Sequence, residues 1–533
     1  MTPTSDKRKY FSMAFVVLFS IGLFGSLKTT FGLFGVDSDT SHSAMLWYGI
    51  HDHGMNFIKE WIFTSDNWLF SLFPIHFLLF TIFGPKPFVV ILTGWLIFIA
   101  SVLLSGIIAK NLNAPKSARI IPIVLIFSGL YAHERGYLSY ATSHNITNLF
   151  GLLSFYCLLK WIKVQKNYLL TLIVLLTVAG GLSDPWIIGA YTLPFSVASL
   201  FLFYSSRNMT ERRAYCFLFS AMIFSLITIK TRIFGTLSFL PSFHFSIGSW
   251  NLVTSNAVNL MKDLGRLLNF LPGTHSNTFI PSLFSVVVFL FLMIRITDLI
   301  AKRCLPQDHL RIVFYCVIAF SIGGMLLAVL VSDNPVQNYS GRYFINVLYL
   351  AVIGVTVVLE LNWDTTSKVL KLASILAGVM FISAGIISNY HLWKVPGIIV
   401  KDNNVLGFID FLSKNKLNYG YGPFWGSSAN AITWLSESKI RIRPVSFEKI
   451  TGRMVRGSRA ESSKLWYLSD DAVNQKSCFV FVKSDGEECP DINVCINGLV
   501  RQFGAPERVL PYDDGFILVW PHPLVKNESM SGF

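Results

Sequence analysis

Residues 11–39 read FSMAFVVLFSIGLFGSLKTTFGLFGVDSD, an apolar run followed closely by two carboxylates, Asp37 and Asp39. The hydrocarbon core of a bilayer is about 30 Å thick, and a helix needs roughly 20 apolar residues to cross it. Carboxylates at the mouth of such a helix are costly unless they face water, a partner or a substrate. The stretch therefore predicts a first spanning helix with acidic chemistry at one membrane surface.

The composition of the 533 residues agrees with a membrane protein, because 53% are hydrophobic and only 14% are charged. Soluble proteins carry about 25% charged residues. The net charge of +14 comes from basic residues dispersed between apolar segments, which is a pattern that sets membrane topology. We therefore expect membrane lipids as partners and no nucleic acid.

Eleven apolar segments are predicted to span the membrane. They are residues 11–27, 88–109, 120–132, 148–162, 168–183, 187–204, 214–231, 279–296, 312–332, 344–360 and 369–390. A further segment, residues 69–83, contains Pro74 and is short for a span. It is predicted as an interfacial or re-entrant helix within one large first outer loop, residues 29–86.

The distribution of basic residues predicts the orientation. The segments assigned to the cytoplasm contain 18 lysines and arginines in 64 residues, whereas the outer loops contain 9 in 136 residues. Because cytoplasmic loops are enriched in these residues, the N-terminus is expected inside the cytoplasm and the C-terminus outside it. Residues 1–390 would then form the membrane module.

Residues 391–533 carry many charges and no further spanning segment, and they predict a small extracytoplasmic α/β domain. Strand-like runs occupy Ile440–Val445, Cys478–Val482 and Gly515–Trp520, with helix-like stretches at 405–412 and 494–503. Cys489 and Cys495 enclose five residues, which suits a short disulfide loop in an oxidising compartment and leaves Cys478 over.

Polar side chains gather at the predicted outer ends of the spans. The candidate site residues are Asp37, Asp39, His42, Arg135, His144, Asp184, Arg342 and Tyr343. They come from different outer loops, so a folded bundle could bring them to one extracytoplasmic cavity. The spacing His51-x-His53 is not helical metal spacing, and no compact cluster completes a set of four ligands, so no metal centre is predicted.

Asp37-Ser38-Asp39 is the sharpest of these elements. Its two carboxylates could bind a divalent cation, or act as a base and its orienting partner. The alternative is a loop in which Asp39 caps a helix that begins at Thr40. Arg342, beside Tyr343, could clamp a phosphate with its planar fork, or it could be an arginine that anchors the helix at the interface.

The acidic pair after the first span, the long first loop with its short helix, the many spans and the C-terminal domain together resemble GT-C superfamily glycosyltransferases. The topology is similar to that of the protein O-mannosyltransferase and aminoarabinose transferase branches. Asp39-Thr40-Ser41-His42 resembles the Asp-Glu-x-Arg pattern of aminoarabinose transferases, with His42 at the position of the arginine. Arg342-Tyr343 resembles a late outer-loop Arg-Tyr pair of such enzymes.

This resemblance implies a membrane glycosyltransferase of the cell envelope, located in the bacterial inner membrane with its active site outside the cytoplasm. The donor would be a sugar on a polyprenyl phosphate, and the acceptor a lipid-linked glycan, a lipid or a protein. Asp39 would be the general base of an inverting transfer, Asp37 would orient the acceptor or bind a cation, and Arg342 with Arg135 would neutralise the leaving phosphate. The alternatives are a transporter or flippase for a lipid-linked sugar, and an enzyme like the O-antigen ligases or polymerases.

Overall fold

The computed structural model describes most of the chain. The described residues are 4–206, 208–233, 235–241, 246–268, 308–337, 340–398, 401, 404–457, 460–468, 475–484 and 489–524, with the backbone alone for 4–12. The longer helices at the N-terminal side are α1 (Thr4–Leu33), α5 (Pro87–Asn111), α6 (Ser117–Ile126), α8 (Asn145–Val164), α9 (Asn167–Ser183), α10 (Leu193–Ser205, preceded by the π-helix η1, Ile188–Thr192) and α11 (Met209–Lys230). They are followed by α12 (Trp250–Leu267), α14 (His309–Val331), α15 (Ile345–Leu361, preceded by the 3₁₀ helix η2, Ser340–Phe344) and α16 (Lys368–Trp393).

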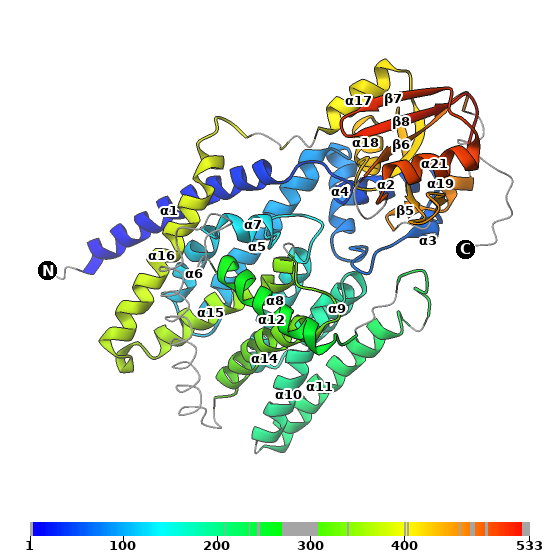
Figure 1. The fold of residues 1–533 in the computed structure, drawn as a ribbon. Helices are drawn as coiled ribbons and strands as arrows, with labels where there is room; N and C mark the ends of the chain where they lie inside the picture. Colours follow the sequence, from blue (N-terminus) through cyan, green and yellow to red (C-terminus); the bar gives the residue numbers. More distant parts are fainter. Residues whose placement is uncertain are drawn as a thin grey trace.

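Seven helices in the described residues are long and apolar enough to cross a membrane. They are Met13–Leu33, Pro87–Asn111, Ile188–Ser205, Met209–Lys230, His309–Val331, Ser340–Leu361 and Lys368–Trp393. Each corresponds to a predicted span, and together they make the chain an integral membrane protein. Figure 1 shows α10, α11 and α14 packed beside one another, with α1 and α16 at the opposite side of the bundle.

The other four predicted spans have different outcomes. The segment 120–132 is a ten-residue helix, α6, that contains Pro122 and ends at Ile126. The segment 168–183 is the 17-residue α9, and 148–162 falls in α8, which begins with the polar residues Asn145, Thr147 and Asn148. The segment 279–296 lies outside the described residues. The number of eleven spans therefore stays a prediction.

The segment predicted as the first loop, residues 29–86, begins inside α1, which extends to Leu33, and the rest of it folds into short elements. These are α2 (His42–His53), α3 (Phe57–Glu60), β1 (Trp61–Ile62) and α4 (Phe73–Phe83). α4 has 11 residues, with Pro74 in its first turn. At 1.5 Å per residue it is about 16 Å long, about half of what a bilayer core requires. α4 is therefore too short to cross by itself, as the sequence predicted.

The C-terminal region contains a six-stranded mixed sheet of order β4-β3-β2-β6-β8-β7. Its strands are β2 (Tyr419–Pro423), β3 (Arg441–Phe447), β4 (Met454–Arg456), β6 (Cys478–Lys483), β7 (Arg508–Tyr512) and β8 (Gly515–Trp520), and its helices are α17 (Val405–Lys414), α18 (Ala429–Leu435), α19 (Leu465–Leu468) and α21 (Ile492–Phe503). β2 is parallel to both β3 and β6, whereas the remaining pairs are antiparallel. The predicted strands at β3, β6 and β8 and the predicted helices at α17 and α21 are confirmed.

The central strand β2 was not predicted, because its sequence Tyr-Gly-Tyr-Gly-Pro contains residues that are rare in strands. The neighbouring strand explains the glycine at 420. A Cβ atom there would lie 2.5 Å from the carbonyl oxygen of Phe479 on β6. The close approach of the two backbones thus requires a residue without a side chain.

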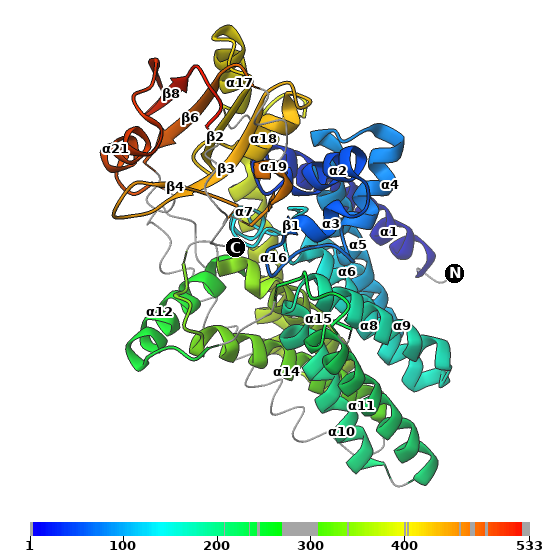
Figure 2. The same cartoon turned by 90° about the vertical axis from the view of Figure 1, so that its right-hand side faces the viewer.

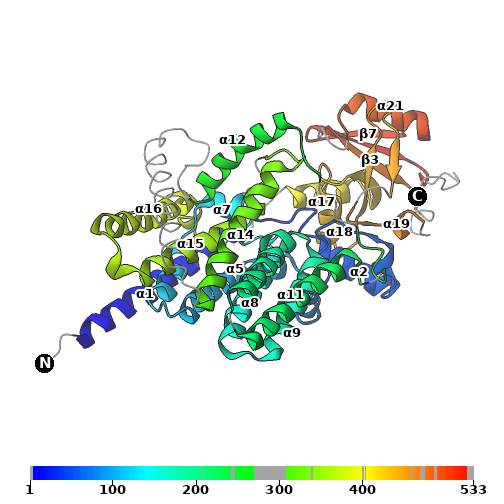
Figure 3. The same ribbon diagram turned by 90° about the horizontal axis from the view of Figure 1, so that it is seen from below.

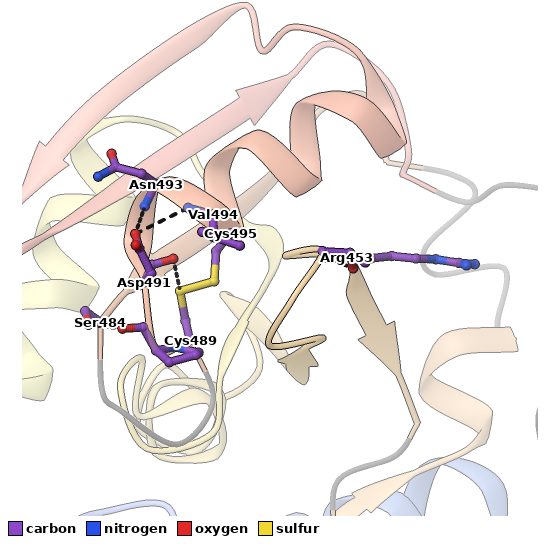
Figure 4. Close-up of a disulfide and its surroundings, with 9 residues drawn as sticks. Arg453, Ser484, Cys489, Asp491, Asn493, Val494 and Cys495 are labelled. Carbon is purple, nitrogen blue, oxygen red and sulfur yellow. Dashed lines mark hydrogen bonds between the residues drawn. A yellow bond between two sulfur atoms is a disulfide. The ribbon is translucent and has the colours of Figure 1, made fainter.

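The predicted disulfide between Cys489 and Cys495 is present (Figure 4). It lies at the beginning of α21, where the Asp491 carboxylate accepts hydrogen bonds from the backbone N–H groups of Asn493 and Val494. Cys478 is free and buried, as expected for the cysteine left over. The disulfide and the aspartate cap together fix the first turn of α21.

The first loop and the C-terminal sheet share one hydrophobic core. β1 pairs with the short strand β5 (Ser462–Ser463), and the rings of Trp61 and Trp466 meet edge to face with centroids 5.3 Å apart. Trp434 on α18 donates a hydrogen bond to the carbonyl oxygen of Pro85 at the end of the loop. Figure 2 shows α2, α3 and β1 between the sheet and the long helices. Burial of these aromatic side chains joins two regions almost 400 positions apart.

Candidate functional site

The Asp37-Ser38-Asp39 motif forms a tight turn between α1 and α2. The carboxylate of Asp37 accepts hydrogen bonds from the backbone N–H of Thr40 (2.8 Å), the Thr40 hydroxyl (2.9 Å) and the Tyr140 hydroxyl (3.0 Å). The hydroxyl of Ser38 donates to the carbonyl oxygen of Phe424 in the C-terminal region (2.7 Å). Asp37 therefore holds the turn closed, and Ser38 attaches it to the sheet.

The side chain of Asp39, unlike that of Asp37, faces a cavity. It lines a cavity of about 180 Å³ whose other lining residues are Thr64, Asp66, Arg342, Phe424, Trp425, Ala460 and Glu461. Among the residues that the structure describes, none donates a hydrogen bond to its carboxylate. The cavity thus presents an available carboxylate, two further carboxyl groups and one guanidinium.

Burial raises the pKa of Asp39 well above its usual range. The like charges of Glu461, Asp37 and Asp66 raise this pKa further, and the positive charge of Arg342 opposes them. Burial also raises the pKa of Asp66. A carboxylate with a raised pKa is a stronger base than an ordinary carboxylate. Asp39 is therefore the strongest base candidate in the cavity.

Glu461 lies at the end of a chain of contacts that begins in the first loop. The indole N–H of Trp61 donates to Nε2 of His42 at 2.8 Å, and Nδ1 of His42 lies 3.4 Å from Oε1 of Glu461. Burial lowers the pKa of His42 to about 3, so its ring is neutral at pH 7. Because Nε2 accepts from Trp61, the single ring proton lies on Nδ1, facing Glu461.

The backbone around Glu461 is equally well fixed. Its N–H donates to the carbonyl oxygen of Ile62 (2.7 Å), and its own carbonyl oxygen accepts from the side chain of Asn430 (2.8 Å). Its φ of +61° is unusual for a residue with a side chain. Positive φ values in such residues often mark functional positions, and here the conformation sets Glu461 beside Asp39.

Arg342 brings the positive charge into the cavity from η2, at the beginning of the α15 span. Its Nη2 donates to the hydroxyl of Tyr343 (3.2 Å), and its guanidinium lies 5.1 Å from the centre of that ring. The carbonyl oxygen of Tyr343 accepts in turn from the indole N–H of Trp186 (3.0 Å). Tyr343 thus orients the arginine and is itself held by the 183–186 turn.

His144 and Asp184 form a buried pair behind the cavity. Nδ1 of His144 lies 2.7 Å from Oδ2 of Asp184, and the imidazole stacks on Trp186 and packs against the ring of Tyr343. Nε2 of His144 has no hydrogen-bond partner in the described residues. The pair does not line the cavity, but His144 and Asp184 have opposing electrostatic effects on the pKa of Asp66, which does.

The predicted site residues therefore divide into four groups. Asp39 and Arg342 line the cavity, while Tyr343, His144 and Asp184 support it from behind. Asp37 and His42 lie beside it and hold neighbouring elements. The Arg135 side chain does not line the cavity, and its guanidinium lies 3.5 Å from the Glu134 carboxylate.

The described residues contain no group of three or more His, Cys, Asp or Glu side chains arranged to hold a metal ion. The pairing of Asp37 with Asp39 as cation ligands also lacks support from the geometry. The Asp37 oxygens are occupied by Thr40 and Tyr140, and Asp37 is not a lining residue of the cavity.

Sequence reasoning missed Asp66, Glu461 and Trp425. Asp66 stands in a polar stretch of the first loop, Thr64-Ser65-Asp66-Asn67, which was a usable signal. Glu461 follows Arg-Ala in a region that looks like an ordinary charged surface loop, and Trp425 follows an unrecognised strand. The positions of Glu461 and Trp425 depend on the packing of the sheet against the first loop, which local sequence does not encode.

No protein-family model matches the sequence, and no curated protein matches it. Among solved structures, the chain is similar to the oligosaccharyltransferase of Archaeoglobus fulgidus in complex with zinc and sulfate. The match covers 88% of this chain and 68% of that chain, with a TM-score of 0.43 and 10% sequence identity. A likeness at this level does not establish a shared reaction or substrate, so the function is argued below from the residues of the site.

Proposed function

We propose that this protein is a membrane glycosyltransferase that moves a sugar from a polyprenyl-phosphate donor to an acceptor hydroxyl. The observation that carries the proposal is the presence, in one cavity, of a carboxylate that accepts no hydrogen bond from the described residues, Asp39, and a guanidinium, Arg342. The first suits removal of a proton from an acceptor, and the second suits stabilisation of a departing phosphate. The base is needed on the acceptor side of the transferred sugar, and the phosphate ligand is needed on the donor side.

Asp39 is the proposed general base. It takes the proton of the acceptor hydroxyl as the acceptor oxygen forms its bond to the anomeric carbon, and the bond between that carbon and the phosphate oxygen breaks with its electron pair leaving on the phosphate. The raised pKa of Asp39 brings its basicity closer to what the reaction needs at neutral pH. Attack and departure on opposite faces of the sugar invert the anomeric centre.

Arg342 is the proposed phosphate ligand. Its planar fork matches two phosphate oxygens, and Tyr343 holds that fork at a fixed angle. His144 lies against the same tyrosine, so the His144–Asp184 pair keeps Tyr343 in place. Charge that develops on the leaving phosphate is stabilised most strongly in a partly buried site, where water screens it less.

The acceptor side of the cavity is supplied by the C-terminal region together with Asp66 of the first loop. Trp425, at 42% exposure, offers an aromatic face to a sugar or lipid-linked glycan, while Asp66 and Glu461 can accept hydrogen bonds from hydroxyl groups. Substrates of this kind arrive from the membrane, since the cavity lies where the α1 and α15 spans end. A glycan, a lipid or a protein acceptor is compatible with this arrangement.

The proposed location of the site is the extracytoplasmic face of a bacterial inner membrane, with a membrane module at 1–390 and an α/β domain at 391–533. The asymmetry of lysine and arginine supports this orientation. The disulfide in the C-terminal region supports it independently, because disulfides persist in oxidising compartments.

Reporter fusions at Ser205 should report cytoplasm and fusions after Tyr390 should report the outside. A cytoplasmic C-terminal reporter would overturn the orientation.

The decisive experiment compares the envelope glycans and lipid-linked sugars of host cells with and without the chain. Loss of the chain should remove one glycan modification and leave its lipid-linked donor to accumulate. The parental chain should restore the modification, and Asp39→Asn should not, at equal amounts of membrane-inserted protein. A transporter would instead leave the donor trapped on the cytoplasmic side, and an Asp39→Asn variant with full complementation would exclude the proposed chemistry.

Purified enzyme separates the two sides of the reaction. Arg342→Lys keeps a positive charge but loses the fork, whereas Arg342→Ala loses both. We expect partial transfer from the lysine variant and little from the alanine variant, with a raised KM for the donor and a smaller change for the acceptor. Equal transfer by all three proteins would remove Arg342 from the phosphate site.

A further inference from the structure

A second polar cavity lies beside α12, away from the site described above. α12 packs against α14 near the end of that span, and Figure 3 shows the two helices next to each other. The Asn256 side chain donates to the carbonyl oxygens of Ser332 (3.3 Å) and Asn334 (3.2 Å) and accepts from the backbone N–H of Val336 (2.8 Å). α12 therefore packs against the segment that joins the end of α14 to the next span, which begins at Ser340.

One side of α12 is apolar and exposed. Trp250, Val258 and Met261 are exposed by 77%, 57% and 56%, and at about 100° per residue they fall within one arc of roughly 80°, which also contains the exposed Thr254 and the buried Gly265. Leu260 and Leu267 are buried on the opposite side against the protein. Trp at one end and apolar residues along one arc are typical of a helix that lies in the membrane interface.

The cavity lies on the polar side of α12 and begins next to this arc, since Lys262 is about 40° beyond Val258 around the helix. It has a volume of about 190 Å³ and is lined by Asn259, Lys262, Asp263, Arg266, Val336 and Gln337. Two of these residues are cationic, and Arg266 also lies over the ring of Tyr131 with its guanidinium 5.6 Å from the ring centre. None of the six lines the cavity that contains Asp39.

Asp263 is the feature that indicates a ligand. It is 5% exposed, and its Oδ1 accepts a hydrogen bond from the Tyr131 hydroxyl at 2.7 Å. Its Oδ2 is buried and makes no hydrogen bond within the described parts of the chain. A buried carboxylate oxygen without a donor costs free energy, which a cationic donor in the cavity would remove.

We propose that this cavity binds the headgroup of a membrane lipid that carries both a phosphate and an ammonium group, of the phosphoethanolamine type. Lys262 and Arg266 bind the phosphate, Oδ2 of Asp263 accepts from the ammonium, and the acyl chains run along the apolar arc of α12. The charges match this ligand, because a phosphate alone would meet the Asp263 carboxylate and an amine alone would meet two cations. The occupant is a lipid rather than a soluble compound, because the cavity opens at the edge of an interfacial helix.

The test uses the full chain, purified in detergent, delipidated and titrated with lipids that share their acyl chains, with bound lipid counted by native mass spectrometry. The parental chain should prefer phosphatidylethanolamine to phosphatidylglycerol by on the order of 10-fold, as expected for one charge-assisted hydrogen bond. The double variant Lys262→Ala/Arg266→Ala should lose about 10-fold for both lipids. Asp263→Asn should lose the preference and keep phosphatidylglycerol binding. Lys59→Ala, an exposed lysine of α3, should behave like the parent.

Two results would overturn the proposal. The first is equal binding of the two lipids by the parental chain, which needs no variant and so remains decisive if Asp263→Asn does not fold. The second is unchanged binding by the double variant. Free phosphoethanolamine should bind at least about 10-fold more weakly than the lipid, because it cannot use the apolar arc. If it binds as tightly, the interfacial role of α12 is wrong.

Discussion

Substitution of Asp39 by asparagine should separate catalysis from stability, because the two effects have opposite signs. The side chain keeps its shape but can no longer take a proton at neutral pH. No described residue donates a hydrogen bond to the Asp39 carboxylate, so the replacement breaks none. The same cavity holds the carboxyl groups of Asp66 and Glu461, so the replacement also removes one of three like charges.

The expected magnitudes follow from these contacts. A general base contributes about 10²- to 10⁴-fold to the rate, which is about 3 to 5 kcal/mol of transition-state stabilisation. Relief of charge repulsion should stabilise the fold by about 1 kcal/mol. Because the pKa of Asp39 is raised in the folded state, its protonated form favours the fold, and this benefit is lost as pH rises through the folded-state pKa. The gain from Asp39→Asn should therefore appear at neutral pH and disappear in acid.

The assay pairs transfer kinetics with thermal unfolding of the same detergent-solubilised protein. Asp37→Ala is the matched control, since it removes the acceptor for the Thr40 N–H, the Thr40 hydroxyl and the Tyr140 hydroxyl. It should cost about 1 to 3 kcal/mol of stability for the donors left without a partner. Asp39→Asn should lose transfer without losing stability. A variant that unfolds earlier and transfers at the parental rate per folded molecule would refute the assignment of Asp39 as base.

Three further outcomes are expected. Glu461→Gln removes the like charge that raises the pKa of Asp39 most strongly after burial, so the acid limb of the kcat/KM profile should move to lower pH, and an unmoved limb would place the base elsewhere. Cys489→Ser opens a disulfide that joins cysteines six positions apart, and it should lower stability by about 2 kcal/mol, with reductant having the same effect on the parental chain and none on the variant. Gly420→Ala would place a Cβ atom 2.5 Å from a β6 carbonyl oxygen and should lower the stability by about 1 to 3 kcal/mol. Gly323→Ala, which has open space around its Cβ position, should not destabilise the protein. Equal melting temperatures for the two variants would contradict the packing described for β2.

The sequence predicted the parts of the fold that depend on local composition. Long apolar runs report spanning helices directly, because each run must match the thickness of the bilayer by itself. The three strands β3, β6 and β8 were also readable, because each is a short run rich in apolar or β-branched residues. The strand β2 was not, because Gly420 lies where the β6 backbone approaches closely and Gly422 lies where the Ser427 side chain does.

Charge and chemistry at the ends of the spans were likewise visible in the sequence. Asp39 and Arg342 were recognised as candidates because a charged group at the end of a spanning helix is costly unless it faces water, a partner or a substrate. The motif itself gave Asp37 and Asp39 the same chemistry, and only the resemblance to a family pattern favoured Asp39 as the base. The difference comes from Tyr140, which takes one carboxylate into a hydrogen-bonded turn and leaves the other facing the cavity.

What the sequence determined by itself is thus a multi-spanning chain with an acidic turn after its first span and a C-terminal α/β region. Only the tertiary structure decided that the C-terminal region completes the cavity. Ser38 bonds to Phe424, β1 pairs with β5, and Glu461 arrives beside Asp39 through that pairing. The physical reason is that hydrogen bonds and aromatic contacts between segments almost 400 residues apart depend on both partners at once, so neither segment carries the information alone.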